Sequence, residues 1–167
     1  MRISIKENLE HLNKIIDNFT KIRKLYKAVG EYMLTSVEEN FQAQGRPTRW
    51  KRLSIATLKS GYKGKKFKKR GGLTKAFRDH VAGKKILIDS GRLKNSITYK
   101  VKAIKKLQDT KIYIGTNMVY AAIHQYGGYA GRGRKVYIPA RPYLLMQEQD
   151  RVWISSFFRK NLWEKEG

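Results

Sequence analysis

The side chains that most often carry out acid–base or metal chemistry are few in this sequence and far apart. The histidines are His11, His80 and His124, and the chain has no cysteine. No two histidines have the HExxH or HxH spacing, so a zinc site would need carboxylates that the basic half of the chain hardly contains. The lack of thiols also excludes cysteine nucleophiles and disulfides. We therefore expect no metal, no cofactor and no enzymatic activity.

His124 is the histidine with a candidate partner at helical spacing. Tyr120 precedes it by four residues, so the two side chains would share a face of a helix. A general acid or base needs an oriented partner and a reacting group nearby, and the sequence identifies neither. We therefore favour a structural role, in which His124 fixes a short helix against a sheet or a neighbouring subunit, over a catalytic one.

Glycine-rich stretches suggest phosphate or nucleic-acid binding only superficially. The sequence contains no GxSxG, Walker or GxGxxG motif, and GYAGRGRK at 128–135 is better explained as a flexible surface loop. GYKG at 61–64 resembles the GxxG loop of KH RNA-binding domains, which lies between two helices. The lysine run beside it favours a disordered arm instead.

Positive charge is concentrated in one stretch of the chain. Between Arg46 and Lys85 there are fifteen lysines and arginines and a single acid, Asp79. Within it, GYKGKKFKKRGG combines glycine with a run of like charges, which is typical of a mobile loop or arm. The candidates for contact with a polyanion are Lys63, Lys65, Lys66, Lys68, Lys69 and Arg70. The alternative is that this arm is merely a solvated loop.

The overall charge also indicates an anionic neighbour. Thirty-seven lysines and arginines against thirteen acids give a net charge of +24, which attracts nucleic acid or acidic protein surfaces. The N-terminal stretch lacks the apolar core of a signal peptide, and no window approaches the roughly 18 apolar residues of a membrane span. We expect no membrane partner and a protein that is soluble and cytosolic where it is made.

A long helix is predicted before the basic stretch. Apolar residues from Ile5 to Phe41 recur at spacings of three or four, which places them along one stripe. A helix over 5–42 would be roughly 57 Å long at about 1.5 Å per residue. Because that exceeds the usual length of a globular helix, either Gly30 marks a break or the far end packs on another subunit.

Short strands are predicted after the basic stretch. Apolar and polar residues alternate over 97–101 and again over 112–114, which predicts an antiparallel hairpin with its turn near 105–110. Residues 136–138 form a further predicted strand.

Three helices are predicted around these strands. The stretch Asp89-Ser90-Gly91 offers an N-cap for a short turn that carries Leu93 and Ile97. Residues 118–126 are compatible with a helix ended by Gly127, and Pro142 is well placed in the first turn of a final helix.

The predicted class is α+β, with a small, mainly antiparallel β-sheet packed with a long N-terminal helix and a C-terminal helix. A basic flexible loop interrupts this arrangement. We expect a single domain over 1–167, and it has four parts: an N-terminal helical region over 5–42, a basic loop or arm over 60–85, a sheet-containing core over 86–142 and a C-terminal helix over 143–165.

Four segments of the chain together resemble a known family. GRPTRWKRLSIAT, ILIDSGRLKNSITY, IYIGTNMVYAAIHQYGG and YIPARPYL occur in the order found in the phage virion morphogenesis, or tail completion, family, and they cover about residues 45–145. The first forty residues and the lysine-rich stretch are poorly covered. Tyr143 stands where the family often has phenylalanine.

The resemblance rests on nineteen positions. They are Trp50, Leu53, Thr57, Asp89, Gly91, Leu93, Ser96, Ile97, Gly115, Thr116, Tyr120, Ala121, His124, Gln125, Gly127, Pro139, Ala140, Arg141 and Pro142. It implies a structural protein of the virion that acts at the neck or tail end, where the tail meets the head, and that assembles in the bacterial host cytoplasm.

The implied partners are copies of the chain in a ring, most simply a hexamer, together with the tail tube or tail terminator and head connector proteins. DNA in the channel is a further candidate. A stand-alone nucleic-acid-binding protein, with the basic arm as its active surface, is the alternative.

Several of the shared positions have physical reasons to be structural. Gly91, Gly115 and Gly127 fall where turns or helix ends favour a residue without a Cβ. Arg141 lies on a segment stiffened by a proline on either side, so it is a candidate for a fixed ion pair within or between subunits. The alternative for Arg141 is an ordinary surface arginine.

Overall fold

The computed structural model describes residues 5–102 and 110–162, and it divides into two compact units. The first unit consists of Met1–Ser36, Thr98–Gly115 and Met146–Gly167, and the second of Val37–Ile97 and Thr116–Leu145. The combination of helices with small antiparallel sheets confirms the α+β class. Most of the expected turn at 105–110, the end of the expected C-terminal helix and the side chain of His11 lie outside the described part of the chain.

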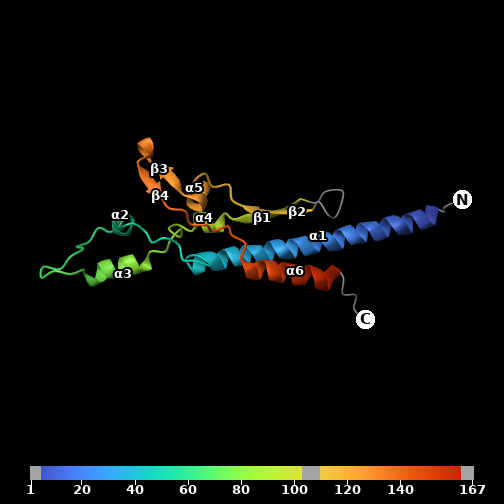
Figure 1. The fold of residues 1–167 in the computed structure, drawn as a ribbon, viewed down its shortest axis with the longest axis horizontal. Helices are drawn as coiled ribbons and strands as arrows, with labels where there is room; N and C mark the ends of the chain where they lie inside the picture. The colour runs from blue at the N-terminus through green and yellow to red at the C-terminus, as the bar shows by residue number, and fades with distance from the viewer. Residues whose placement is uncertain (1–4, 103–109, 163–167) are drawn as a thin grey trace. The chain divides into compact units, whose positions relative to one another are not determined.

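The long helix of the first unit is unbroken. α1 (Ile5–Gln42) continues through Gly30, as Figure 1 shows. Gly30 is buried, and a Cβ at this position would overlap the ring of Tyr99. The break expected at Gly30 is therefore wrong, because the missing side chain makes room for an aromatic ring instead of ending the helix.

α6 (Glu148–Leu162) lies antiparallel to α1 within the first unit (Figure 1). Tyr32 stacks on Trp153 with ring centroids 3.8 Å apart, and Tyr26 meets Phe158 at 5.2 Å. The partner of the earlier α1 residue comes later in α6, which is the order that antiparallel packing requires. Among the side chains of α1 that the structure describes in this unit, the buried apolar ones are Leu25, Val29 and Met33.

The antiparallel hairpin predicted from the sequence is confirmed. β1 (Thr98–Lys102) pairs with β2 (Lys111–Gly115) in antiparallel register, with Tyr99 opposite Ile114. The half-buried positions alternate with exposed ones along both strands, which is the pattern that the sequence showed. The hairpin therefore turns one face inward, and Tyr99 from that face reaches Gly30.

The second unit contains the short helices and the second hairpin. Its elements are the end of α1, α2 (Ile55–Lys59), α3 (Lys75–Gly83), α4 (Arg92–Asn95), α5 (Ala121–Tyr126), β3 (Gly128–Ala130), η2 (Arg132–Arg134) and β4 (Val136–Ile138). β3 and β4 pair antiparallel. The strand expected at 136–138 and the helix that ends before Gly127 are confirmed. The single sheet expected from the sequence is instead two separate two-stranded sheets among the described residues.

The core of this unit is aromatic. Phe41, from the last turn of α1, is fully buried and meets the edge of Trp50 at 5.5 Å and the ring of Tyr143 at 5.6 Å. Just beyond Phe41, α1 ends in a Schellman-type turn, in which the Gly45 N–H donates to the carbonyl of Asn40. This turn sends the chain back toward Trp50.

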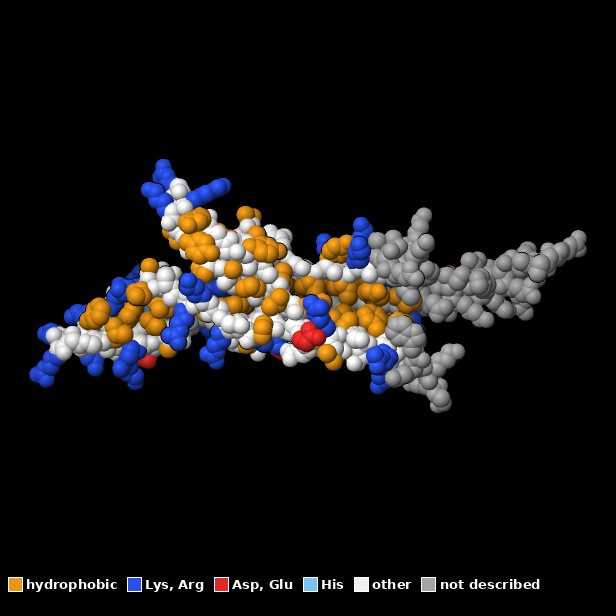
Figure 2. Space-filling view, viewed as in Figure 1, with side chains coloured by type: hydrophobic (Ala, Val, Ile, Leu, Met, Phe, Trp, Pro, Cys, Tyr) orange, Lys and Arg blue, Asp and Glu red, His pale blue; other side chains and the backbone are white. Residues whose placement is uncertain are grey.

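The basic stretch contains more regular structure than a loop over 60–85 would have. Thr74 caps α3 by accepting a hydrogen bond from the Phe77 N–H, and Phe77 is buried against the ring of Tyr62. The expectation of a loop is therefore wrong over 75–83, because an N-cap and an apolar anchor outweigh the sparse hydrophobicity. Lysine and arginine side chains gather over α3 and the segment before it in Figure 2.

One expected helix start agrees with the structure, and another differs. Gly91, with φ of +73°, occupies the N-cap position of α4, so the cap lies in the stretch from Asp89 to Gly91 that was expected to supply it, although no side chain caps the helix. α6 begins at Glu148, not near Pro142, because side chains from elsewhere hold the residues after Pro142 in a non-helical conformation. Gly115 ends β2 without a positive φ and with open space around it, so its expected turn role is wrong.

Candidate functional site

The residues from Arg141 to Leu144 form a non-helical segment at which three of the family-like segments meet. We call it the 141–144 segment. The carbonyl of Pro142 accepts hydrogen bonds from Trp50 Nε1 at 3.1 Å and from Asn40 Nδ2 at 3.2 Å. The Asn40 amide also donates to the carbonyl of Tyr143 at 3.1 Å. Residues about ninety to a hundred positions apart in the chain are joined here.

Gln125 holds the same segment from the side of α5. Its Oε1 accepts from the backbone N–H groups of Tyr143 and Leu144, both at 3.0 Å, and its Nε2 donates to the Leu144 carbonyl at 2.9 Å. A glutamine amide thus satisfies backbone groups of this segment that no helix or strand pairs. Tyr143 is 1% exposed, and its hydroxyl donates to the carbonyl of Ala121 at 3.3 Å.

Asn40 is a functional position that the sequence analysis missed. It is 1% exposed, and its Oδ1 accepts from the Arg46 N–H at 2.7 Å while its Nδ2 serves two carbonyls. A polar residue within the apolar stripe beside Phe41 was the available signal. Its burial with donors and acceptor engaged makes it a rigid connection between α1 and the 141–144 segment.

Other shared positions form the frame around this segment. Gly127 ends α5 with φ of +75°, and a Cβ there would come within 2.8 Å of the Ala140 backbone nitrogen. The Ser96 and Thr116 hydroxyls form a hydrogen bond of 2.6 Å. Leu93 is buried. The family-like segments are therefore brought together mainly as scaffold.

Arg141 is neither an ordinary surface residue nor part of an ion pair in the described chain. Its side chain is 6% exposed, and no described carboxylate lies within salt-bridge distance. Its Nε donates to the Lys51 carbonyl at 3.0 Å and a terminal nitrogen to the Arg52 carbonyl at 3.4 Å. Burial lowers the pKa of Arg141 from its usual value. The structure thus contains a buried guanidinium whose described partners are neutral.

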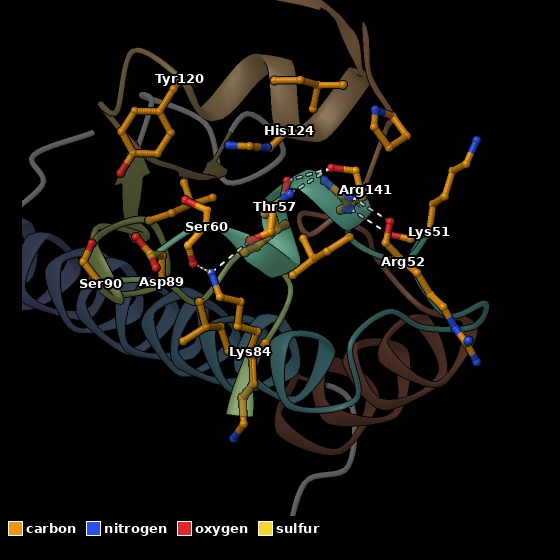
Figure 3. A pocket seen from close by; sticks show the side chains of 18 of the residues that line it. Lys51, Arg52, Thr57, Ser60, Lys84, Asp89, Ser90, Tyr120, His124 and Arg141 are labelled. Atoms are coloured by element: carbon orange, nitrogen blue, oxygen red, sulfur yellow. Dashed lines mark hydrogen bonds between the residues drawn. The ribbon is translucent and has the colours of Figure 1, made fainter. Parts of the chain in front are cut away.

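Arg141 lines a pocket of about 710 Å³ that lies within the second unit. Segments 51–60, 84–93 and 136–141 and the α5 region contribute to it. Figure 3 shows Arg141 with its hydrogen bonds to the carbonyls of Lys51 and Arg52, whose own side chains extend away from it. On another side, Lys84 Nζ donates to the carbonyls of Thr57 and Ser60.

His124 lines the same pocket. Its ring stands nearly perpendicular to that of Tyr120, with centroids 5.9 Å apart, which agrees with the predicted common face. Its Nδ1 is buried and has no hydrogen-bond partner among the described residues, whereas its backbone carbonyl accepts from the Arg141 N–H at 2.8 Å. Burial, and then the charge of Arg141, lowers the pKa of His124. The imidazole is therefore neutral near pH 7.

The remaining predicted residues lie at the pocket or on the surface. Asp89 is exposed and lines the pocket with Tyr120 and Pro139. The six candidates for polyanion contact lie before and within a short hairpin over 66–74, which is joined by hydrogen bonds from Lys68 N–H to the Gly72 carbonyl and from Thr74 N–H to the Lys66 carbonyl. Five of the six are exposed and Lys66 is half-buried, so their charge faces outward.

The described residues contain no cluster of His, Asp and Glu able to hold a metal ion. None of the helices in the same part of the chain is long and apolar enough to cross a membrane.

Comparison with known proteins agrees with this arrangement. A model of the phage virion morphogenesis family matches residues 3–163. The Mu-like prophage FluMu G protein 2 of Haemophilus influenzae is 36% identical over 128 residues, which cover 77% of this chain and 69% of that protein. No solved structure matches the chain. The resemblance seen in the sequence is thus confirmed, and the family match also reaches the first forty residues, which the resemblance did not cover.

Proposed function

The chain belongs to the phage virion morphogenesis family, and from this membership we propose that it completes the tail and helps to join it to the head at the neck, as a homo-oligomeric ring. The observation that carries the proposal is the family match over nearly the whole chain, together with a relative from a Mu-like prophage. A role in phage morphogenesis follows from the family. The neck position, the ring and the lack of an enzymatic activity are the proposal.

The roles of the shared residues support a scaffold and not a catalyst. Trp50 and Gln125 use their polar atoms to hold the 141–144 segment. A catalytic residue would instead present its reactive atom toward a substrate. Such connections give a rigid subunit, which an ordered assembly needs.

Exposed aromatic side chains support an assembly surface on the second unit. Tyr126, which ends α5, is 79% exposed, and Tyr129 is 64% exposed. Tyr129 meets Tyr137 across the β3–β4 hairpin with centroids 5.3 Å apart. Tyrosines of this kind are enriched at protein interfaces. Head-to-tail contacts through such a surface form a closed ring when the rotation closes.

Mass measurement of the purified protein, alone and after mixing with tails, tests this proposal. We expect a defined oligomer, most simply a hexamer, either in solution or on the tail. Tyr126→Glu should weaken assembly, whereas Val152→Glu, at a 59% exposed position of α6, is the matched control. A strictly monomeric protein at low and moderate salt that does not associate with tails would contradict the ring.

Charge supports the second candidate, a nucleic-acid-binding protein. The second unit has twenty-one lysines and arginines against four acids, a net charge of +17 out of the +24 of the whole chain. If this is the function, the protein should be a monomer or dimer whose main affinity is for DNA or RNA. The same mass measurement, combined with a DNA-binding titration, distinguishes the two candidates.

A further inference from the structure

The pocket that Arg141 lines has an uneven charge. Its lining residues include a single acid, Asp89, and six cations, which are Lys51, Arg52, Lys84, Lys85, Arg92 and Arg141. The side chains of Lys51 and Arg52 extend away from Arg141 (Figure 3), so these two residues contribute backbone carbonyls and not charge to its surroundings. Burying a charge without a counter-charge is costly, and Arg141 is 94% buried among neutral carbonyl acceptors. An anionic group in the pocket would supply the missing counter-charge.

A second polar group in the pocket has no described partner. His124 Nδ1 is buried there without a hydrogen bond, and the imidazole lies close enough to Arg141 to feel its charge. A carboxylate can accept hydrogen bonds from a guanidinium and from a neutral imidazole N–H at once. One carboxylate would therefore satisfy both groups, and because Nδ1 is buried, this contact requires the imidazole to turn toward the pocket.

The lining also contains apolar side chains, beside the hydroxyl groups of Ser54, Thr57, Ser60 and Ser90. Leu53, Leu87, Ile88, Leu93, Val136 and Ile138 contribute to it. Aliphatic side chains offer little to a phosphate backbone, which favours water and cations, but they suit the hydrophobic side chains of a peptide. The ligand should therefore carry apolar groups beside its acid.

A strand that contributes to the pocket lining, β4, has an unpaired edge. β4 contributes Val136, Tyr137 and Ile138, and among the described strands it pairs with β3 alone. The other side of a strand with a single partner can receive an extended peptide through main-chain hydrogen bonds. This favours a peptide over a small metabolite.

We propose that this pocket binds a short, extended segment of a partner protein in which acidic and apolar residues alternate, with one carboxylate seated between Arg141 and His124. The site goes beyond the ring and does not depend on it, since every residue involved belongs to the second unit of one chain.

The binding test uses the purified full chain at about physiological ionic strength. The probe is a fluorescein-labelled hexapeptide of alternating glutamate and leucine with blocked ends, followed by fluorescence anisotropy. We expect saturable binding, and at least tenfold weaker binding when glutamine replaces every glutamate. Equal affinity for the two peptides, or no binding of the acidic one, overturns the proposal.

Matched variants locate the site. Val136→Glu adds an acid at a 60% exposed position of the pocket wall, whereas Val119→Glu adds the same charge at a 98% exposed position outside it. We expect at least tenfold weaker binding for Val136→Glu and a change within twofold for Val119→Glu. Arg141→Gln should also weaken binding at least tenfold. If that variant does not fold, the two valine variants still decide the result.

The short hairpin over 66–74, together with the lysines just before it, is the main competing site for an acidic probe, and we call it the basic hairpin. Replacing Lys65, Lys66, Lys68 and Lys69 with Gln should leave peptide affinity within threefold, and loss of binding in this variant overturns the pocket assignment. The imidazole proton resonances of His124 should shift on titration with the acidic peptide. A single-stranded oligonucleotide that binds with the same sensitivity to Val136→Glu also overturns the proposal, because it would assign the pocket to nucleic acid.

Discussion

The ring of Tyr99 occupies the space that a side chain at Gly30 would need. Gly30 lies in the middle of α1, and a Cβ built on it would overlap three ring carbons of Tyr99. The Tyr99 hydroxyl also donates to Glu31 Oε1 at 3.3 Å. The β1–β2 hairpin of the first unit is therefore seated on α1 at its one glycine.

Gly30→Ala should destabilise the protein. Alanine favours a helix by about 1 kcal/mol over glycine, but overpacking costs about 1–3 kcal/mol, so we expect a net loss. Urea unfolding followed by circular dichroism measures it. Gly83→Ala, where nothing lies within 4 Å, is the control and should be neutral or stabilising. If Gly30→Ala is equally destabilising in a Tyr99→Leu background, the overlap with the ring is not the cause.

Asn40→Asp should weaken the connection to the 141–144 segment. The variant replaces the donor of two hydrogen bonds with an oxygen that faces the carbonyls of Pro142 and Tyr143. We expect a loss of at least about 3 kcal/mol in the free energy of unfolding at neutral pH, because a buried charge is left unpaired. The loss should shrink near pH 4 as the carboxyl gains a proton. Asn117→Asp, at an exposed position, should change stability little, and similar losses for both variants would contradict this role of Asn40.

Asp150→Asn should destabilise the first unit. Asp150 is fully buried and accepts from the Ser36 hydroxyl at 2.9 Å, the Gln147 N–H at 2.7 Å and the Tyr32 hydroxyl at 3.2 Å. An amide group cannot accept all three, so we expect a loss of about 1.5–3 kcal/mol. Thermal unfolding measures it. Glu148→Gln removes an exposed pair with Arg151 at 3.9 Å and should have almost no effect.

His124 should contribute to loss of stability in acid. Burial and the charge of Arg141 hold its folded pKa below the usual histidine value of about 6.5. As pH falls through about 6.5, the unfolded state gains a proton that the folded state resists, so the free energy of unfolding falls until the folded pKa is reached. His124→Gln should remove this part of the pH dependence as pH falls below about 7. Urea titrations at each pH give the free energy of unfolding of both proteins, and equal slopes of that free energy against pH would refute the assignment.

Charge removal on the basic hairpin should change salt dependence and leave the fold intact. Each phosphate contact contributes a slope of about −0.9 to the salt dependence of duplex DNA binding, so six contacts weaken it over a thousandfold between about 50 and 200 mM salt. Replacing Lys65, Lys66, Lys68 and Lys69 with Gln should flatten that slope by up to about 3.6.

The matched control for the hairpin removes the same charge from α1. Lys21, Arg23, Lys24 and Lys27 are all exposed, and changing them to Gln should leave the slope nearly unchanged. If the parent binds tails but not DNA with the same salt sensitivity, the partner is an acidic protein surface. Should neither interaction change in the hairpin variant, the segment is only a solvated loop.

Helices and strands with a periodic pattern of apolar residues could be predicted from the sequence alone. The apolar stripe of α1 and the alternation of β1 and β2 follow from periods of 3.6 and 2 residues, which can be read without knowing the fold. The order of four motif segments likewise identified the family before any contact was known. These features depend on residues close together in the chain.

The roles of residues that contact distant parts of the chain could be seen only in the folded structure. Pro142 suits the first turn of a helix as well as a non-helical segment. Asn40 and Trp50, which are 102 and 92 residues away from it, donate to its carbonyl and favour the non-helical form. Gly30 could break a helix or admit a ring, and Tyr99 decides between them. The partners of Arg141 could not be identified from the sequence, because backbone carbonyls, which every residue carries, accept its hydrogen bonds. Such contacts leave no periodic pattern in the sequence, since each is fixed by packing between segments that fold together.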